Sequence, residues 1–235
     1  MKKSIAIITA RGGSKRILRK NIRMFIGKPI IAYSIGTALE SGIFDEVMVS
    51  TDNTEIAGIA RQLGAQVPFL RSEKNSDDNA TTADVISEVI DTYRKLAIHF
   101  QYVCCIYPTA VFVTAEMLSR AKKVLEETSV DSVIPVVRFD VPIERALKKE
   151  SDGSISFLNP QHIQTKTQDL PVSFHDAGQF YWLKIKSFER HRALFMKRTF
   201  GMEIDPDRVQ DIDTEEDWQT AEKKFRLLSG NKKHV

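Results

Sequence analysis

The amino-acid sequence predicts an α/β fold, a mostly parallel twisted sheet with helices on both faces and a small insertion arm. Along most of the 235 residues, short β-favouring apolar runs alternate with amphipathic stretches of helical length. The run from Tyr102 to Tyr107 is apolar without alternation, as in strands buried on both faces of a parallel sheet. The length, with 42% hydrophobic and 28% charged residues, is typical of one globular domain, and we expect residues 1–235 to form it.

Strands and helices are expected in alternating order. The first helix should begin at Pro29 and end at Gly42, because proline favours the first turn of a helix and glycine follows its end. Asp52 and Asn53 should cap the second helix, and Gly64 should close it. The expected strands lie at 4–10, 46–51, 66–70, 102–107, 132–137 and 179–185, and the expected helices at 29–42, 53–63, 81–96, 115–127 and 214–228.

Residues 139–170 interrupt this alternation. They are rich in Asp, Pro, Gly, Ser and Gln, and only 155–158 form a short apolar piece. Such a stretch is either a long functional loop or a small insertion, and we expect it to form an arm. Phe180 and Trp182, in the strand that follows, are expected in the core.

Composition limits the classes of function. The net charge of +3 is too small to indicate nucleic-acid binding. The adjacent Cys104 and Cys105 lie in an apolar run, which indicates no disulfide framework and fits a reducing cytoplasm. The apolar run Ile5–Ile8 is too short for a signal peptide or a membrane span. We therefore expect a cytoplasmic protein that binds neither nucleic acid nor membranes.

A basic loop with two glycines follows the first strand. Gly12 and Gly13 have no Cβ atom, so backbone N–H groups there can approach an anion closely. No acidic residue precedes Glu40, so nothing nearby in sequence neutralises the cations of this loop. These cations are Arg11, Lys15, Arg16, Arg19, Lys20 and Arg23. The loop therefore predicts a site for a highly charged phosphate chain.

Known phosphate-binding motifs do not describe this loop. The Gly-Lys-Ser/Thr spacing of a P-loop and the third glycine of a dinucleotide fingerprint are both missing. The alternative is a solvated basic loop without a ligand. Its place after the first strand favours a ligand site, because ligands of α/β proteins bind outside the carboxyl ends of the strands.

Two carboxylates near the other end of the chain indicate a metal site. Asp211 and Asp213 are two residues apart, so in an extended segment they point the same way. Mg²⁺ commonly takes one or two carboxylates together with water and substrate phosphates. The alternative is that Asp213 only caps the last helix, which leaves Asp211 unexplained. With the basic loop, the pair predicts a Mg²⁺-nucleotide site built from both chain ends.

The motifs of the chain resemble those of a known enzyme family. Ala10–Lys15, followed by Lys20-Asn21, is similar to the opening motif of the cytidylyltransferases that activate nonulosonic acids, the CMP-sialate synthetases and their relatives. The match continues in order to Asp217. The resemblance implies that CTP is bound by Arg11, Gly12, Gly13, Ser14, Lys15, Lys20 and Asn21, with Arg11, Lys15 and Lys20 as catalytic cations. It also implies Mg²⁺ at Asp211 and Asp213.

The segment 71–82 resembles the family's base-binding segment. By this match Arg71, Ala80 and Thr82 would recognise cytosine, with Asp78 as a structural neighbour. From the spacing alone, an ordinary capped helix start is the favoured alternative, because Asp78 or Thr81 would make a good cap.

The sugar-binding segments resemble the pseudaminic acid branch of this family. Tyr107 stands where sialate enzymes usually carry a glutamine, which makes a sialate substrate doubtful. The residues assigned to the sugar by this resemblance are Tyr107, Thr109, Gln168, His175, Asp176, Gln179 and Tyr181. The partners implied are CTP, a nonulosonic acid and a second copy of the chain, with 139–170 as a dimerisation arm near the partner's site. Alternatives are a sister enzyme for sialic, legionaminic or ketodeoxyoctonic acid, and a catalytically silent nucleotide-binding protein.

Overall fold

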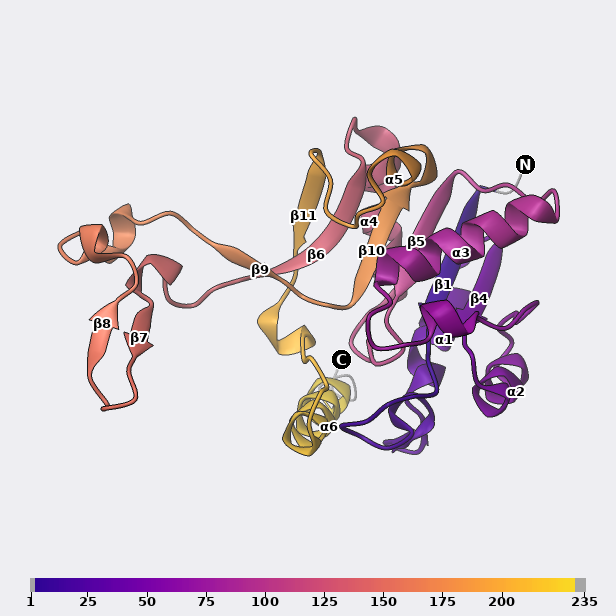
Figure 1. The fold of residues 1–235 in the computed structure, drawn as a ribbon, viewed down its shortest axis with the longest axis horizontal. Coiled ribbons are helices and arrows are strands. Elements are labelled where there is room, and N and C mark those ends of the chain that lie inside the picture. The colour runs from indigo at the N-terminus through magenta and orange to yellow at the C-terminus, as the bar shows by residue number, and fades with distance from the viewer. Residues whose placement is uncertain (1–2, 231–235) are drawn as a thin grey trace.

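The computed structural model describes residues 3–230 and confirms the α/β class (Figure 1). A seven-stranded sheet has the order β11-β6-β10-β5-β1-β4, and β9 pairs with the end of β6. The strands are β1 (Ser4–Thr9), β4 (Glu46–Ser50), β5 (Tyr102–Ile106), β6 (Ser132–Arg138), β9 (Phe174–Asp176), β10 (Phe180–Lys184) and β11 (Thr199–Glu203). The helices are α1 (Ile31–Glu40), α2 (Thr54–Gln62), α3 (Thr82–Lys95), α4 (Ala115–Glu127), α5 (Ile185–His191) and α6 (Glu215–Gly230). No helix among these residues is both long and apolar enough to cross a membrane.

The sheet is mixed rather than largely parallel. β1 is parallel to β4 and β5, and β11 is parallel to β6. β10 lies antiparallel between β5 and β6, because the chain enters it on its way back from the insertion arm. The strand predicted at 66–70 is reduced to one bridge between Met48 and Gln66. Strand β11 and helix α5 were not predicted.

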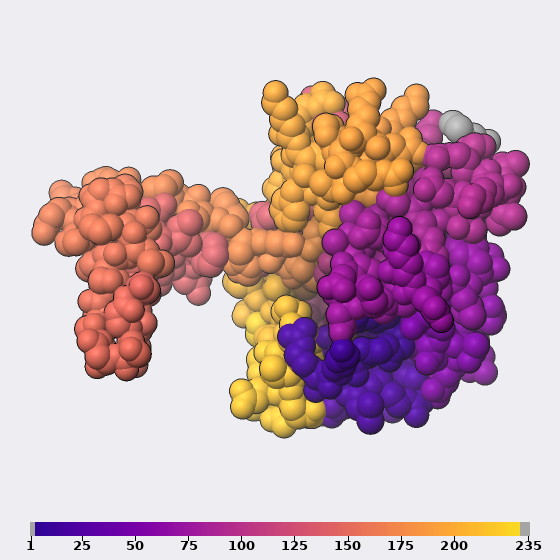
Figure 2. Space-filling model, viewed as in Figure 1, coloured from indigo at the N-terminus to yellow at the C-terminus, as the bar shows by residue number. Residues whose placement is uncertain are grey.

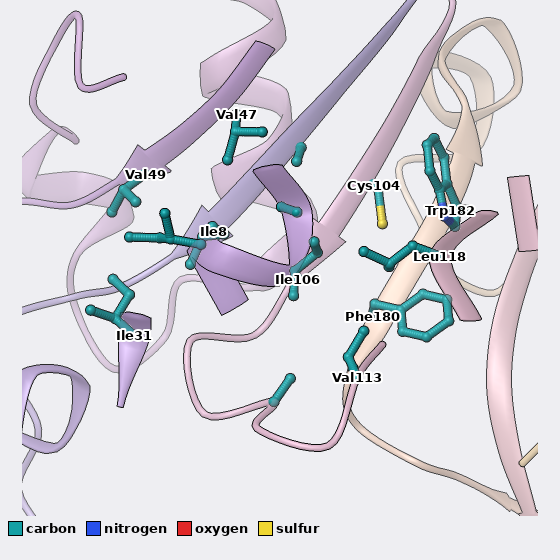
Figure 3. Packing of buried hydrophobic residues seen from close by; sticks show 14 of the residues in the cluster. Ile8, Ile31, Val47, Val49, Cys104, Ile106, Val113, Leu118, Phe180 and Trp182 are labelled. Carbon is teal, nitrogen blue, oxygen red and sulfur yellow. The ribbon is translucent and has the colours of Figure 1, made fainter. Parts of the chain in front are cut away.

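Side chains alternate between the two faces of the sheet, and helices cover both faces. On one face, Ile8, Cys104 and Trp182 pack with α1, α2 and α4 (Figure 3). On the other face, residues one position along the same strands pack with α3 and α5. Phe180 and Trp182 are fully buried, as predicted. The apolar, unalternating sequence of β5 is explained by this double cover, since each of its faces is buried.

Helix α6 packs on the segment that follows the basic loop. The two-stranded hairpin β2 (Met24–Phe25) and β3 (Lys28–Pro29) places the buried Phe25 against Trp218 and Phe225 of α6, with ring centroids 5.5 and 5.6 Å apart. Ile17 and Ile212 are buried in the same cluster. This packing places the region of the basic loop and its hairpin beside the last helix, as the adjoining indigo and yellow surfaces in Figure 2 show.

The insertion forms an arm that projects from the body (Figures 1 and 2). Within it, β7 (Leu147–Lys149) and β8 (Ile155–Phe157) pair as an antiparallel hairpin, and β9 ends the arm by joining β6. Of the seventeen large hydrophobic side chains exposed among the described residues, nine lie between 139 and 174. The arm therefore carries apolar surface that this protomer does not cover.

A buried carboxylate holds the start of β6 against β11. Asp131 is 5% exposed and accepts hydrogen bonds from Arg198 (Nη2 at 2.9 Å, Nε at 3.0 Å) and from the Ser187 hydroxyl at 2.6 Å. The hydrogen bonds from Arg198, which have the larger effect, and from Ser187 lower the pKa of Asp131 to about 2. Because this pKa lies below that of the unfolded chain, the stabilisation is complete above about pH 5 and is lost as the pH falls toward 2.

Replacing Asp131 by asparagine should therefore lower the free energy of unfolding by about 2 kcal/mol at pH 7. At pH 3 the loss should shrink to about half, because much of the unfolded-state carboxyl is then protonated. Urea unfolding across this pH range measures both values. The exposed Asp140→Asn is the matched control and should change neither. An equal loss at both pH values would show that the stabilisation does not come from the ionised Asp131 carboxylate.

Candidate active site

An open pocket of about 580 Å³ lies beyond the carboxyl ends of β1, β4 and β5. Four segments that are distant in sequence line it: the basic loop from Arg11 to Asn21, part of 71–85, the end of β5 at 107–109, and Asp211 with Asp213. The three strands are parallel, so their ends meet at one edge of the sheet. The fold thus brings together the phosphate, base and metal motifs predicted from the sequence.

Two hydrogen bonds hold the basic loop in place, one at Gly12 and one at the buried Asn21. The Gly12 N–H donates to Asp52 Oδ1 at 2.7 Å, and a Cβ atom at Gly12 would lie 2.9 Å from the Asn53 side chain. Asn21 is buried and its Nδ2 donates to the Arg11 carbonyl at 2.8 Å. Gly12 and Gly13 do not line the pocket, whereas Arg11, Ser14, Lys15, Lys20 and Asn21 do. Close packing on Asn53, rather than an anion, is the visible reason for Gly12.

Every cation of the loop has an acidic partner, although, as expected, none of these partners is nearby in sequence. The partners come from distant segments, so the sequence near the loop does not reveal them. Arg11 and Lys15 both pair with Asp78, at 2.8 and 2.5 Å, and lower its pKa, Lys15 more than Arg11. Asp213 pairs with Arg16 and Lys20, Glu55 with Arg19, and Glu215 with Arg23.

Lys20 links the basic loop to the segment that carries Asp211 and Asp213. Its Nζ donates to the Ile212 carbonyl at 2.6 Å and to Asp213 Oδ1 at 3.2 Å, and its side chain is 20% exposed. Thr214 caps α6, because its hydroxyl accepts from the Asp217 N–H while Asp217 accepts from the Thr214 N–H. The alternative that Asp213 serves only as the cap is therefore wrong, and its carboxylate faces the cations of the pocket.

Asp211 and Asp213 are suited to a hard divalent cation. Both line the pocket, and Asp211 makes no ion pair among residues 3–230. Partial desolvation, and then the neighbouring Asp213, raise the pKa of Asp211. In the described part of the chain, no three His, Cys, Asp or Glu side chains are arranged so that they could hold a metal ion by themselves. The pair fits Mg²⁺, which completes its shell with water and phosphate oxygens, whereas a metal held by protein alone does not fit.

The predicted base-binding residues lie together at the pocket wall. Arg71 is 8% exposed and is held by the end of β4, with Nε donating to Ser50 Oγ at 3.0 Å and Nη2 donating to the Ser50 carbonyl at 2.5 Å. Burial lowers the pKa of Arg71. Ala80 and Thr82 line the same pocket. Thr81, not Asp78, caps α3.

Only some of the predicted sugar residues line the pocket. Tyr107 and Thr109 line the pocket. Asp176 and Tyr181 lie behind Tyr107, with the Tyr181 hydroxyl 2.6 Å from Asp176 Oδ2. Gln179 is buried and donates to the Arg208 carbonyl at 2.7 Å. None of these last three lines the pocket of this protomer.

Two sugar residues belong to the arm and its base. Gln168 lies in a short 3₁₀ helix of the arm, Thr167–Asp169, and His175 lies in β9. The His175 ring stands 4.9 Å from that of Phe139, and its Nδ1 is 3.0 Å from the Asp176 carbonyl oxygen. Neither residue reaches this protomer's pocket.

The pocket wall includes residues that sequence reasoning missed. Asn75 and Asp77 come from the loop before α3, and Val85 comes from its first turn. The Asp77 carboxylate accepts from the Asn79 and Ala80 N–H groups and shapes this loop. Asp77 followed by small polar residues is a signal for such a turn, and it was available in the sequence.

Comparisons with known proteins show which family the sequence matches. A family model described as cytidylyltransferase matches residues 5–233. Pseudaminic acid cytidylyltransferase of Campylobacter jejuni is 36% identical over 96% of this chain and 97% of its own length. CMP-N,N'-diacetyllegionaminic acid synthase of Legionella pneumophila is 32% identical over 95% of this chain and 96% of its own.

A solved structure shares the fold at low sequence identity. CMP:2-keto-3-deoxy-manno-octonic acid synthetase complexed with CTP superposes with a TM-score of 0.68 at 14% identity, covering 98% of this chain and 99% of the other. This likeness supports the fold assignment. The family match and the two relatives span nearly all of the sequence. The chain therefore belongs to the cytidylyltransferase family.

Proposed function

We propose that this cytidylyltransferase transfers CMP from CTP to the anomeric hydroxyl of a nonulosonic acid, pseudaminic acid in preference to others, and releases pyrophosphate. The observation that carries the proposal is the single pocket in which basic-loop cations, Arg71 with Thr82, and Asp211 with Asp213 meet. The similarity over nearly the full length to a pseudaminic acid cytidylyltransferase supports the choice of sugar.

The chemistry required is mainly alignment and charge neutralisation. Arg11, Lys15 and Lys20 would bind the triphosphate and stabilise the departing pyrophosphate. Asp211 and Asp213 would hold Mg²⁺, which when bound neutralises phosphate charge and orients the reacting oxygens. The triphosphate would replace Asp78 as the partner of Arg11 and Lys15, since both are ion-paired to that exposed carboxylate. A catalytically silent protein would not need these groups, and the chain retains them all.

One comparison supports a second candidate for the sugar substrate. The Legionella pneumophila relative is named for diacetyllegionaminic acid and is 32% identical to this chain. Tyr107 and the segment His175–Gln179 favour pseudaminic acid, because they resemble that branch. Legionaminic acid is therefore the second candidate.

We also propose that the active form is a homodimer. The arm carries exposed apolar side chains, and Gln168 and His175 lie outside this protomer's pocket. In a dimer, the arm would reach the site of the partner, where its apolar side chains would be covered and Gln168 and His175 would lie near a pocket. CTP, the sugar acid and a second copy are thus the proposed partners, with Mg²⁺ as cofactor and the cytoplasm as the location.

Pyrophosphate release from CTP and Mg²⁺ tests the function. We expect release with a nonulosonic acid and none without one, because the second substrate supplies the attacking oxygen. A panel of pseudaminic, legionaminic, N-acetylneuraminic and ketodeoxyoctonic acids covers the alternatives. Absence of release with every member of the panel would contradict the proposal, and so would equal release in the absence of any sugar.

A further inference from the structure

Asp78 lines the pocket and holds two of the cations that are proposed to bind the triphosphate. Its Oδ1 lies 2.8 Å from Arg11 Nη1, and its Oδ2 lies 2.5 Å from Lys15 Nζ. Arg11 Nη1 also donates to the Asp77 carbonyl oxygen at 3.1 Å, so this cation contacts two neighbouring residues of one turn. Among the described residues, the Asp78 carboxylate has no partner besides these two cations. One protein carboxylate thus takes the place on both cations that a phosphate group would need.

The turn that carries Asp78 is fixed by its own hydrogen bonds. Asp77 Oδ1 accepts from the Asn79 and Ala80 N–H groups at 2.9 and 2.8 Å, which shapes the backbone on both sides of Asp78. Directly after the turn, the Thr81 side chain caps α3. Although its side chain is 52% exposed, Asp78 is therefore presented to the two cations by ordered backbone.

The Asp78 carboxylate is charged at neutral pH, because Lys15, and then Arg11, lower its pKa. Exposed ion pairs of this kind contribute little to the stability of a protein, since solvent screens both charges. Their effect falls instead on any anion that must share the same cations. A phosphate group that binds Arg11 and Lys15 has to displace the carboxylate, and it then lies beside the negative charge of Asp78.

Asp213 offers a comparison within the same pocket. It also pairs with two cations of the basic loop, Arg16 and Lys20. Asp213 is one of the two aspartates proposed to hold Mg²⁺, however, and the metal would balance its charge beside the phosphates. Asp78 has no such compensation, because the cations paired with it among residues 3–230 are the two that the phosphates would take. Its charge therefore repels a bound polyphosphate.

We propose that Asp78 is a competing counter-ion, which returns to Arg11 and Lys15 and so speeds the departure of pyrophosphate. This inference rests on the proposed reaction, in which the two cations would otherwise retain the pyrophosphate after CMP has been transferred. The competition weakens the phosphate contacts of CTP as well, but CTP also has a base for Arg71 and Thr82 to bind. A weakened phosphate site therefore still binds the substrate and releases the product.

Calorimetric titration of the full chain with pyrophosphate, without metal or sugar acid, tests this competition directly. Asp78→Asn keeps the shape of the side chain and removes its charge, so it should lower the Kd for pyrophosphate by about tenfold. Asp78→Ser should do the same and decides the matter if the asparagine variant fails to fold. Asp78→Glu retains the charge and should keep the Kd near that of the unmodified protein. Damage to the fold would weaken binding, so tighter binding separates the proposed role from a structural one.

Glu55→Gln is the matched control. Glu55 pairs with Arg19 of the same loop and is as exposed as Asp78, 55% against 52%, but it does not line the pocket. The control removes one negative charge and one ion pair of the loop, and it should leave the Kd for pyrophosphate unchanged. In a Lys15→Ala background, one of the two ion pairs of Asp78 is already absent, so Asp78→Asn should lower the Kd by only about threefold.

Inhibition of turnover by added pyrophosphate gives a second measurement, and it should become about tenfold stronger in Asp78→Asn. If the unmodified protein releases no pyrophosphate from CTP with any sugar acid, the proposed function itself is wrong. If it is active, and Asp78→Asn and Asp78→Ser bind pyrophosphate no more tightly than it does, Asp78 does not compete and this inference is wrong. Equal tightening in Glu55→Gln would also overturn it, because net charge would then be the cause.

Discussion

Replacing Asp211 or Asp213 by alanine is expected to lower kcat by about 10²-fold or more at saturating Mg²⁺. Each substitution removes a carboxylate that faces the pocket and no core volume, so the fold should remain intact. Losing a preorganised charge at a phosphoryl-transfer site typically has an effect of this size. The measurement is steady-state pyrophosphate release over a range of Mg²⁺ concentrations.

The two variants should differ in one respect. Asp213 also pairs with Arg16 and Lys20, so Asp213→Ala frees two cations and should not weaken the binding of metal-free CTP. Asp207→Ala is the control, because Asp207 is an exposed carboxylate in the preceding turn that does not line the pocket. Near-normal turnover in both pocket variants would contradict the metal assignment.

The second large effect concerns the sugar. We expect kcat/KM for pseudaminic acid to exceed that for N-acetylneuraminic acid by about 10⁴-fold, the size of discrimination reached by sites that hydrogen-bond their substrate. The two acids differ in ring stereochemistry and substituents, so polar groups aimed at one are left unpaired by the other. Competition kinetics on the unmodified enzyme measure the ratio.

His175 provides the matched variant for this prediction. His175→Ala should lower kcat/KM for pseudaminic acid and leave CTP affinity unchanged, because His175 lies on the arm base outside the nucleotide pocket. His191→Ala, at the exposed end of α5, should change neither. Gln179→Ala is less informative, since Gln179 is buried and its loss also disturbs the fold. Equal use of N-acetylneuraminic acid would defeat the choice of sugar and leave the family assignment intact.

The fold was largely predictable because its helices carry local signals. Asn53 caps α2, a capping box of Thr81 and Asp84 starts α3, and Gly64 closes its helix at a φ of +92°. The direction of β10 was not predictable, because a buried apolar strand has the same sequence pattern in either direction. Strand β11 was missed for a related reason, since Thr199–Glu203 has no run of apolar residues.

The composition of the site was predictable, but its electrostatics were not. The basic loop, Arg71 and the two aspartates were each identified from a motif, and residues from each of these motifs line the pocket. Their ion pairs join segments more than 30 residues apart, as between Lys15 and Asp78, and no local pattern encodes such a pairing. The position of His175 relative to the pocket was equally hidden, because it depends on where the arm leaves the sheet.

The bond from Lys20 to the Ile212 carbonyl also has a consequence for biosynthesis. It spans 192 residues, so at about 5–20 residues per second the ribosome makes the basic loop roughly 10–40 s before the aspartates that complete the pocket. In that interval the nascent chain has β1, β4 and β5 to fold, but it has neither Asp213 to neutralise Lys20 nor α6 to cover Phe25. The pocket is therefore completed in one late step of synthesis, and an incomplete chain that ends before residue 211 lacks both aspartates that we propose to hold Mg²⁺.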